Sequence, residues 1–386
     1  MREEWFRQLV SGEKRGIGVS FLRIFLFGVS IIYWIVTSIR NFLYDFRILK
    51  IHKVDIPVIS VGNITLGGTG KSPMVAWLCE YFISQGLRPA IISRGYRRQN
   101  ANNSINADDE LIVNEINGFN RIANANDEYL ELAFRLPDVY HFQNKDRVVA
   151  IRELLRFVSS ESSRGGVDIV ILDDGMQHRR LGRDFEIVLL DAMEPFGYGH
   201  IFPRGRLRES LTGLSRADVI LLSKANCISA EERNRIAKTI RKIASRAIYA
   251  EVIHEPKKIL FFNGKESDVN EIGGKRIFAF CGIGNPASFY SILHNNFGDQ
   301  IHFEQYPDHY EYSRENIIEI IQKAESLKVD LILCTMKDFV KIDQILRSEN
   351  QVKILDSFKK IPFAALIIQI KFLTNEQLFQ ETLNKM

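Results

Sequence analysis

The stretch that decides the fold is IPVISVGNITLGGTGKS, residues 56–72. An apolar run typical of a buried strand leads into a glycine-rich loop, and Pro73 then favours the start of a helix. In such a loop, backbone N–H groups can surround phosphate oxygens, a lysine can reach the terminal phosphates, and a serine hydroxyl can bind Mg²⁺. We therefore predict a phosphate-binding loop formed by Thr65, Gly67, Gly68, Thr69, Gly70, Lys71 and Ser72. Thr65 stands where the strict pattern of such loops has its first glycine.

Further apolar runs rich in valine and isoleucine alternate with segments of helical length. The expected strands lie at 88–94, 167–174, 185–192 and 217–224. Continuous apolar strands that alternate with helices are typical of a parallel sheet covered on both faces. The sequence therefore predicts an α/β fold of the P-loop type, with helices on both faces of a parallel sheet.

The same pattern restarts downstream of about residue 255, with expected strands at 276–284, 300–307, 329–335 and 362–370. A chain of 386 residues also exceeds what one hydrophobic core usually organises. We expect a membrane-associated helix in residues 1–45, a nucleotide-binding domain in 46–255, and a smaller α/β domain in 256–386 that closes over the nucleotide.

The most hydrophobic segment of the chain is residues 17–44. Its charge-free part, 24–37, spans roughly 21 Å as a helix, less than the ~30 Å hydrocarbon core of a membrane. Basic residues flank the segment on both sides, and Tyr33, Trp34 and Tyr44 are of the types enriched at membrane interfaces. We expect a peripheral or monotopic helix that lies in or dips into one leaflet. A crossing helix, with Arg23 reaching the interface, and an ordinary buried helix are the alternatives.

The composition limits the classes of partner that we expect for the chain. The formal net charge of +4 is far below that of a dedicated nucleic-acid binder, so no nucleic-acid partner is expected. The four cysteines form no CxxC pair and have no histidine at metal-ligand spacing, so we predict small buried side chains in a reducing compartment. Nothing in the sequence indicates an obligate protein partner.

A polar run, DDGMQH at 173–178, follows the expected strand 167–174. Carboxylates at the end of such a strand are where P-loop proteins hold their magnesium, so Asp173 and Asp174 are predicted to be metal-associated. The segment LSKAN at 222–226 lies where a GTPase carries its guanine-specificity element. Asn226 replaces the aspartate that would bind guanine, which favours ATP as the nucleotide.

Six motifs, in order along the chain, resemble those of the tetraacyldisaccharide 4′-kinase family, the lipid A 4′-kinases of Gram-negative bacteria. They are PVISVGN…GGTGKSP (57–73), SRGY (93–96), LDDGMQHRRLGRD (172–184), GRLRE (205–209), YPDHY (306–310) and TMKD (335–338). The resemblance covers nearly the whole chain. It implies Mg²⁺-dependent transfer of the ATP γ-phosphate to the 4′-hydroxyl of a tetraacyldisaccharide 1-phosphate, which yields lipid IVA. The implied partners are this lipid-linked disaccharide monophosphate and the cytoplasmic face of the inner membrane.

The resemblance also implies a general base. In such kinases the base is an aspartate in a Gly-Asp-Glu-Pro element, and Asp127 is its best match here, although Tyr129 replaces the proline. Asp109 is a competing match. His309 resembles the partner that hydrogen-bonds this base and tunes it.

Other roles follow from the same motifs. Arg208 resembles a cation that faces the transferred phosphoryl group, and Gln177 and Glu209 resemble further magnesium-associated residues. Arg204 and Arg206 are expected either to meet the 1-phosphate of the acceptor or to be solvated. In TMKD, Met336 replaces the usual glutamate, and its role is left open.

Three other functions compete. A partition-type P-loop ATPase would carry a signature lysine where Leu66 stands, and a metallochaperone-like GTPase would need clustered cysteine and histidine ligands. A homologue that binds nucleotide without transferring phosphate is the third.

Overall fold

The computed structural model describes residues 2–95, 112–113, 127–160, 166–348, 358 and 360–386. These residues form two compact units. Unit 1 takes its described residues from Met1–Arg121, Asp138–Ile253 and Lys371–Met386, and unit 2 takes them from Ile122–Pro137 and His254–Ile370.

The two units are not continuous stretches of chain, unlike the domains expected from the sequence. Helix α4 (Asp127–Arg135) belongs to unit 2, where it packs on α9 (Met336–Ser348). The C-terminal helix α11 (Glu376–Leu383) belongs to unit 1, where the Phe379 ring lies 5.6 Å from that of Trp77. Packing between elements distant in sequence therefore decides which unit a segment joins.

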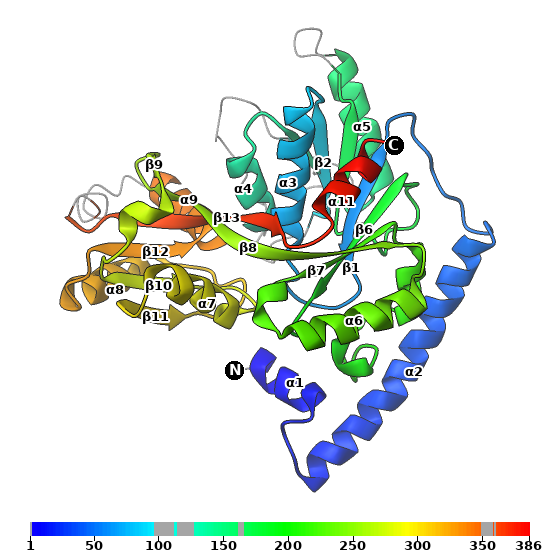
Figure 1. Cartoon of the computed structure of the whole chain (residues 1–386), viewed down its shortest axis with the longest axis horizontal. Coiled ribbons are helices and arrows are strands. Elements are labelled where there is room, and N and C mark those ends of the chain that lie inside the picture. Colours follow the sequence, from blue (N-terminus) through cyan, green and yellow to red (C-terminus); the bar gives the residue numbers. More distant parts are fainter. Residues whose placement is uncertain (1, 96–111, 114–126, 161–165, 349–357, 359) are drawn as a thin grey trace, which may run out of the picture. The chain divides into compact units, whose positions relative to one another are not determined.

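Unit 1 is built on a parallel sheet in the order β3-β4-β2-β5-β1-β6-β7-β8 (Figure 1). Only β3 runs antiparallel to its neighbour among these described strands. The strands are β1 (Val58–Asn63), β2 (Pro89–Ser93), β3 (Ile112–Val113), β4 (Tyr140–Gln143), β5 (Ile169–Asp173), β6 (Phe185–Asp191), β7 (Val219–Ser223) and the first part of β8 (Ile248–Phe261). The α/β fold with a mostly parallel sheet, expected from the sequence, is confirmed.

Burial explains why most of the strands predicted from the sequence are continuous apolar runs. Every residue of β1, β2, β4, β5 and β7 is buried, and neighbouring residues of a strand face opposite sides of the sheet, so both faces are covered. The helices of unit 1 are α1 (Arg2–Ser11), α2 (Ile17–Asp45), α3 (Lys71–Ser84), α5 (Arg147–Ser160), α6 (Ala230–Ile243) and α11, with the 3₁₀ turns η1 (Gly197–Gly199), η2 (Leu211–Arg216) and η3 (Ala225–Cys227).

Unit 2 has its own parallel strands, in the order β11-β10-β12-β13. They are β10 (Ile277–Cys281), β11 (Ile301–Gln305), β12 (Leu331–Thr335) and β13 (Phe363–Phe372), and the short β9 (Glu266–Ser267) pairs with the end of β8. The helices are α4, α7 (Pro286–Phe297), α8 (Arg314–Ser326) and α9, with the 3₁₀ turn η4 (Val269–Ile272).

Strand β10 shows how the core of unit 2 is divided. Phe278 and Phe280 pack in a cluster with side chains of α8 and α9, whereas Ile277, Ala279 and Cys281 pack in a second cluster with side chains of α7. The alternation with period two places helices on both faces of this sheet as well.

Helix α2 is the long blue helix in Figure 1, with 29 residues and a length of roughly 44 Å at 1.5 Å per residue. It is long and apolar enough to cross a membrane, and only 6% of its most apolar window is buried. The alternative of an ordinary core helix is therefore wrong within the described chain. Arg23 does not extend the apolar face, since its guanidinium donates to the carbonyl oxygens of Leu9 at 2.8 Å and Lys14 at 2.6 Å.

Three of the four cysteines, Cys79, Cys281 and Cys334, are buried as expected. Cys227 is exposed, which corrects the sequence-based expectation, because it ends the surface turn η3.

Candidate active site

The loop predicted to bind phosphate has the expected context of strand, loop and helix. It leaves the carboxyl end of β1 and enters α3, which begins at Lys71, two residues earlier than expected. Pro73 therefore lies in the first turn of the helix, where its missing N–H costs nothing. Gly67 (φ 115°) and Gly70 (φ 87°) adopt the left-handed backbone that favours glycine. Thr65, Thr69 and Ser72 are buried at the base of the loop.

Polar side chains at strand ends hold the loop carbonyls. Asn63, the last residue of β1, donates to the carbonyl oxygen of Thr65 at 2.8 Å, and Ser223, the last residue of β7, donates to that of Thr69 at 2.7 Å. Lys224 donates to the carbonyl oxygen of Gly68 at 3.0 Å and pairs with Asp191 at 2.5 Å. Sequence reasoning missed these supporting residues, although each follows an apolar run at the edge where the loop emerges.

Asp174 lies between two cations of the site. Strands β1 and β5 are parallel neighbours with Val61 opposite Asp173, so their carboxyl ends meet at one edge of the sheet. There Lys71 Nζ lies 3.5 Å from Asp174 Oδ1, and Arg208 Nη1 donates to the two carboxylate oxygens at 2.8 and 3.0 Å. Burial alone would raise the pKa of Asp174, but Lys71 and Arg208 outweigh it and lower the pKa to about 2. Asp174 is therefore ionised and orients both cations.

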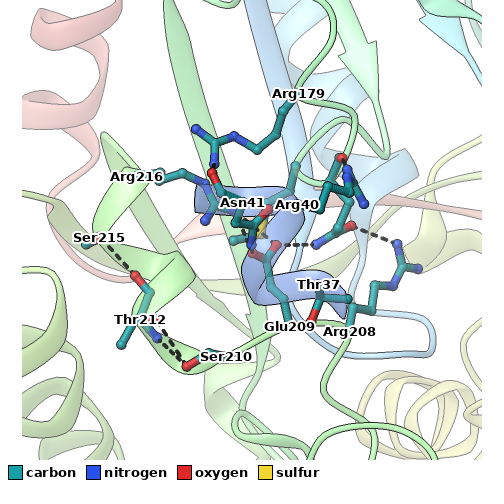
Figure 2. A network of polar contacts seen from close by, with 12 residues as sticks. Thr37, Arg40, Asn41, Arg179, Arg208, Glu209, Ser210, Thr212, Ser215 and Arg216 are labelled. Carbon is teal, nitrogen blue, oxygen red and sulfur yellow. Dashed lines mark hydrogen bonds and ion pairs between the residues drawn. The ribbon is translucent and has the colours of Figure 1, made fainter. Parts of the chain in front are cut away.

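Gln177 and Glu209 continue this network. Gln177 Oε1 accepts from Arg208 Nη1 at 3.2 Å, while its Nε2 donates to Glu209 Oε1 at 3.1 Å and to the carbonyl oxygen of Asn63 at 3.0 Å. Glu209 is only 3% exposed. Its two oxygens also accept from Arg216 Nη2 at 2.9 and 2.8 Å, and Oε2 accepts from Asn41 Nδ2 at 2.7 Å (Figure 2).

The residues predicted to bind magnesium offer hydroxyl, amide and carboxylate oxygens. Ser72 is the second residue of α3, beside the loop, and no hydrogen bond of its hydroxyl is seen among the described residues. Asp173 supplies a buried carboxylate at the end of β5. Hard oxygen donors of these two kinds suit Mg²⁺. Asp174 and Glu209 accept hydrogen bonds from protein donors. The described residues hold no cluster of three or more His, Cys, Asp or Glu side chains arranged for a metal ion.

Asp127 and His309 form a hydrogen-bonded pair within unit 2. Asp127 is the first residue of α4 and is buried, whereas the His309 side chain is 60% exposed. His309 Nδ1 lies 2.9 Å from Asp127 Oδ2, and Lys341 Nζ lies 3.1 Å from the same oxygen. The competing base candidate Asp109 lies outside the described residues.

The charges around the pair set its titration. Burial would raise the pKa of Asp127, but the hydrogen bond from His309 and the ammonium groups of Lys337 and Lys341 hold it well below its usual range. The hydrogen bond to Asp127 raises the pKa of His309 by more than burial lowers it. The carboxylate thus stays ionised, and it stabilises the protonated imidazole.

The TMKD motif supports unit 2. Asp338 is fully buried and accepts from the backbone N–H of Gly282, from the Tyr312 hydroxyl and from the Thr335 hydroxyl. Met336 packs in the apolar cluster of α8 and α9, which is how the structure accommodates an apolar residue at this position.

Arg204 and Arg206 are half-buried rather than solvated. Arg204 Nη1 donates to the carbonyl oxygen of Val10 at 3.0 Å, and its backbone N–H donates to Ser30 Oγ at 2.9 Å, so it joins α1 and α2 to the segment that carries Arg208. Arg206 packs against Gly67, where an added Cβ would come within 2.2 Å of its guanidinium.

Three residues of these groups, Asp174 (φ 51°), Lys224 (φ 57°) and His309 (φ 55°), adopt a left-handed backbone without being glycine. Such strain costs of order 1–3 kcal/mol per residue and concentrates at functional sites. Arg47, Tyr198, Lys328 and Asn375 share this conformation outside the polar clusters described above, so the strain marks these three positions without being confined to them.

Comparison with known proteins gives a consistent result. A sequence model of the family described as "LpxK: Tetraacyldisaccharide-1-P 4'-kinase" matches residues 22–386. The tetraacyldisaccharide 4′-kinase of Halothermothrix orenii is 34% identical over 89% of this chain and 90% of its own length. That of Chlorobium luteolum is 31% identical over 94% of this chain and 97% of its own length.

A solved structure agrees with this assignment. The crystal structure of the "apo" form of LpxK from Aquifex aeolicus in complex with ATP matches with a TM-score of 0.68 and 27% identity, over 92% of this chain and 97% of that chain. The chain therefore belongs to the tetraacyldisaccharide-1-P 4′-kinase family of lipid A biosynthesis and is an ATP-dependent kinase.

Proposed function

We propose that the chain transfers the γ-phosphate of ATP to the 4′-hydroxyl of a tetraacyldisaccharide 1-phosphate and so forms lipid IVA. The observation that carries this proposal is the cluster of Lys71, Asp174 and Arg208 beside the glycine-rich loop. In the reaction, the 4′-oxygen forms a bond to the γ-phosphorus, the bond from that phosphorus to the bridging oxygen breaks, and the proton of the hydroxyl leaves to a base. ADP departs with the bridging oxygen.

The loop and its two cations would stabilise the transferred group. Backbone N–H groups at the start of α3 and the helix dipole favour phosphate oxygens, and Lys71 adds a positive charge. Arg208 offers a guanidinium that Asp174 already orients, so little reorganisation is needed when charge develops on the phosphoryl group.

We propose that Mg²⁺ is held by Ser72 and Asp173, with Asp174, Gln177 and Glu209 as the polar frame around them. The ion would neutralise negative charge on the phosphates. These surrounding residues would orient one another, because Gln177 joins Arg208 to Glu209 by hydrogen bonds.

The pair of Asp127 and His309 is proposed to accept the proton of the 4′-hydroxyl as one unit. The hydrogen bond at His309 Nδ1 orients the imidazole, whose other nitrogen, Nε2, lies 3.9 Å from Asp308 Oδ2 and would receive the proton. The negative charge of Asp127 compensates a proton that arrives on the pair.

We propose that α2 docks the enzyme on the cytoplasmic face of the inner membrane, where both ATP and the lipid acceptor are available. A continuous set of exposed apolar side chains supports this placement; it includes Ile17, Phe21, Ile24, Phe25, Ile32, Trp34, Val36 and Ile39. Such a surface matches an acyl-chain environment.

The test is to incubate the purified protein with labelled ATP and the tetraacyldisaccharide 1-phosphate in detergent micelles. We expect label in the lipid product with the native protein and none with Lys71→Ala, at an unchanged thermal midpoint. Hydrolysis of ATP without a labelled lipid would favour a P-loop ATPase, and binding of ATP with neither reaction would favour a homologue without kinase activity.

A further inference from the structure

The last turns of α2 are hydrogen-bonded to the side chains that surround the phosphate-binding loop. Asn41 Nδ2 donates to Glu209 Oε2 at 2.7 Å, and Figure 2 shows the two residues in the same network as Arg208 and Arg216. From this contact we propose that Asn41 is a positioning residue for phosphoryl transfer, which links the seating of the membrane helix to the nucleotide site. The inference rests on the function proposed above.

A continuous chain of contacts carries the proposal. Asn41 contacts Glu209, Glu209 accepts from Gln177, and Gln177 accepts from Arg208. Arg208 in turn shares Asp174 with Lys71. Each step is a direct contact of 3.5 Å or less between side chains. A helix at the membrane surface is thereby connected to the two cations that would face the terminal phosphate.

The burial of Glu209 makes its hydrogen bond from Asn41 difficult to replace. Glu209 is 3% exposed, so water cannot readily replace a lost donor at its Oε2. Without Asn41, the carboxylate would keep Arg216 and Gln177 as partners and could rotate towards either one. A rotation of Glu209 would move Gln177, and with it the acceptor that helps to hold Arg208.

The polar loop that follows β5 also forms hydrogen bonds with the carboxyl end of α2. Arg179 Nη1 donates to the carbonyl oxygen of Asn41 at 3.0 Å, and its Nη2 pairs with Asp45 at 2.6 Å. Arg40 donates to the carbonyl oxygen of Gln177. Cations at the carboxyl end of a helix are favourable. These contacts fix the backbone from which Asn41 reaches Glu209.

The experiment compares Asn41→Ala with the native enzyme by the affinities for ATP and ADP, measured with a fluorescent nucleotide as the displaced probe. Lys71 and Arg208 would face the terminal phosphate of ATP, so the variant should lose affinity for ATP several-fold while its affinity for ADP stays unchanged. The kcat for transfer should fall on the order of tenfold, as expected when one hydrogen bond to a charged group is lost. The KM for the lipid acceptor should change little.

The matched control is Thr37→Val, one turn earlier on α2. In the described chain the Thr37 hydroxyl bonds only within its own helix, to the carbonyl oxygens of Tyr33 at 3.0 Å and Trp34 at 3.1 Å. This variant should keep the native ratio of ATP to ADP affinity. Glu209→Gln supplies the second arm, because the losses from Asn41→Ala and Glu209→Gln should not add in the double variant.

The proposal is overturned if Asn41→Ala keeps the native ratio of ATP to ADP affinity, or if its effect adds fully to that of Glu209→Gln. A fall in vesicle binding that accounts for the whole loss of activity would also overturn it. If the native enzyme bound ATP but phosphorylated no lipid acceptor, the proposed function would fail, and the affinity ratio would still test Asn41.

Discussion

Lys341 Nζ lies 3.1 Å from Asp127 Oδ2, the oxygen that His309 Nδ1 also contacts at 2.9 Å. The Lys341 side chain is 8% exposed and its ammonium also donates to the carbonyl oxygen of Tyr310 at 3.3 Å. Asp127 therefore compensates two cationic partners at one oxygen, and only the imidazole of His309 reaches solvent. Lys341 is therefore placed to influence the protonation of the Asp127–His309 pair.

Lys341→Met should raise the pKa of Asp127, because the variant removes one of the positive charges that lower it. The Asp127 carboxylate stays ionised above pH 5, so the acidic limb of the profile of kcat against pH reports protonation of the His309 imidazole. The loss of a nearby positive charge should move this limb to higher pH, by about one unit. The measurement is kcat at saturating ATP and acceptor from pH 5 to pH 9. Lys337→Met is the comparison, since Lys337 acts on the same carboxylate from its pairing with Glu128 at 3.2 Å. If the acidic limb did not move, Lys341 would have no influence on the proton transfer.

Asp127→Asn should lower kcat by ~10²–10⁴-fold with little change in nucleotide affinity, because general-base assistance is of this size. His309→Ala should cause a comparable loss, and the double variant should lose little more than either single variant. Asp109→Asn is the control, and we expect it to keep near-native turnover. A large loss for Asp109→Asn with little for Asp127→Asn would transfer the role of base, and fully additive losses would reject a pair that acts as a unit.

The sequence predicted β1, β2, β5, β6 and β7 of unit 1 and β10 to β13 of unit 2, because these strands contain short apolar runs. It missed β3 and β9, which have two residues each, β4, which alternates apolar and polar residues, and β8, which contains charged residues. It also predicted the residues that follow β1 and β5, since loop chemistry there is local in sequence. It could not predict Asn41 or Lys341 as contacts of Glu209 and Asp127, because those pairs are 168 and 214 positions apart. Polar residues on helices are most often solvated, so only the fold distinguishes these two from their neighbours.

The placement of α4 shows a second limit. Its residues precede β4 in sequence, yet they pack with α9 in unit 2. Nothing in the composition of Asp127–Arg135 distinguishes the two destinations, and long-range packing of its apolar face decides between them.

We predict that the buried His141 side chain lowers the free energy of unfolding in mild acid. It is 1% exposed, and burial lowers its pKa to about 3. Ser93 Oγ accepts from Gln143 at 3.0 Å and lies 2.8 Å from His141 Nε2, an arrangement in which the Ser93 hydroxyl can donate to a neutral imidazole. The unfolded chain binds a proton near pH 6.5 and the folded chain does not, so stability falls as pH decreases below 6.5.

The size of this effect follows from the linkage. Between pH 7.5 and pH 5.5, His141 should cost the native protein about 1.4 kcal/mol of unfolding free energy. His141→Gln keeps an acceptor for Ser93 and should reduce the difference in stability between the two pH values by about that amount. Urea unfolding, followed by the fluorescence of the three tryptophans, which all lie in unit 1, measures it at both values. An identical pH dependence in the two proteins would show that His141 is protonated in the folded state.

The apolar face of α2 predicts a separable role in membrane binding. Phe21, 69% exposed, and Phe25, 67% exposed, lie one turn apart on this face. Phe21→Ser together with Phe25→Ser should weaken sedimentation with anionic phospholipid vesicles at least about tenfold, since burying one such side chain contributes roughly 1.5–3 kcal/mol. Activity on a short-chain acceptor in solution should persist, because Asn41 at the other end of the helix still contacts Glu209.

Two single variants, Ile83→Ser and Leu378→Ser, serve as controls for the loss of apolar surface. They remove exposed apolar side chains from α3 and α11 and should leave vesicle binding unchanged. Equal sedimentation of all four proteins would place the membrane contact elsewhere on the chain.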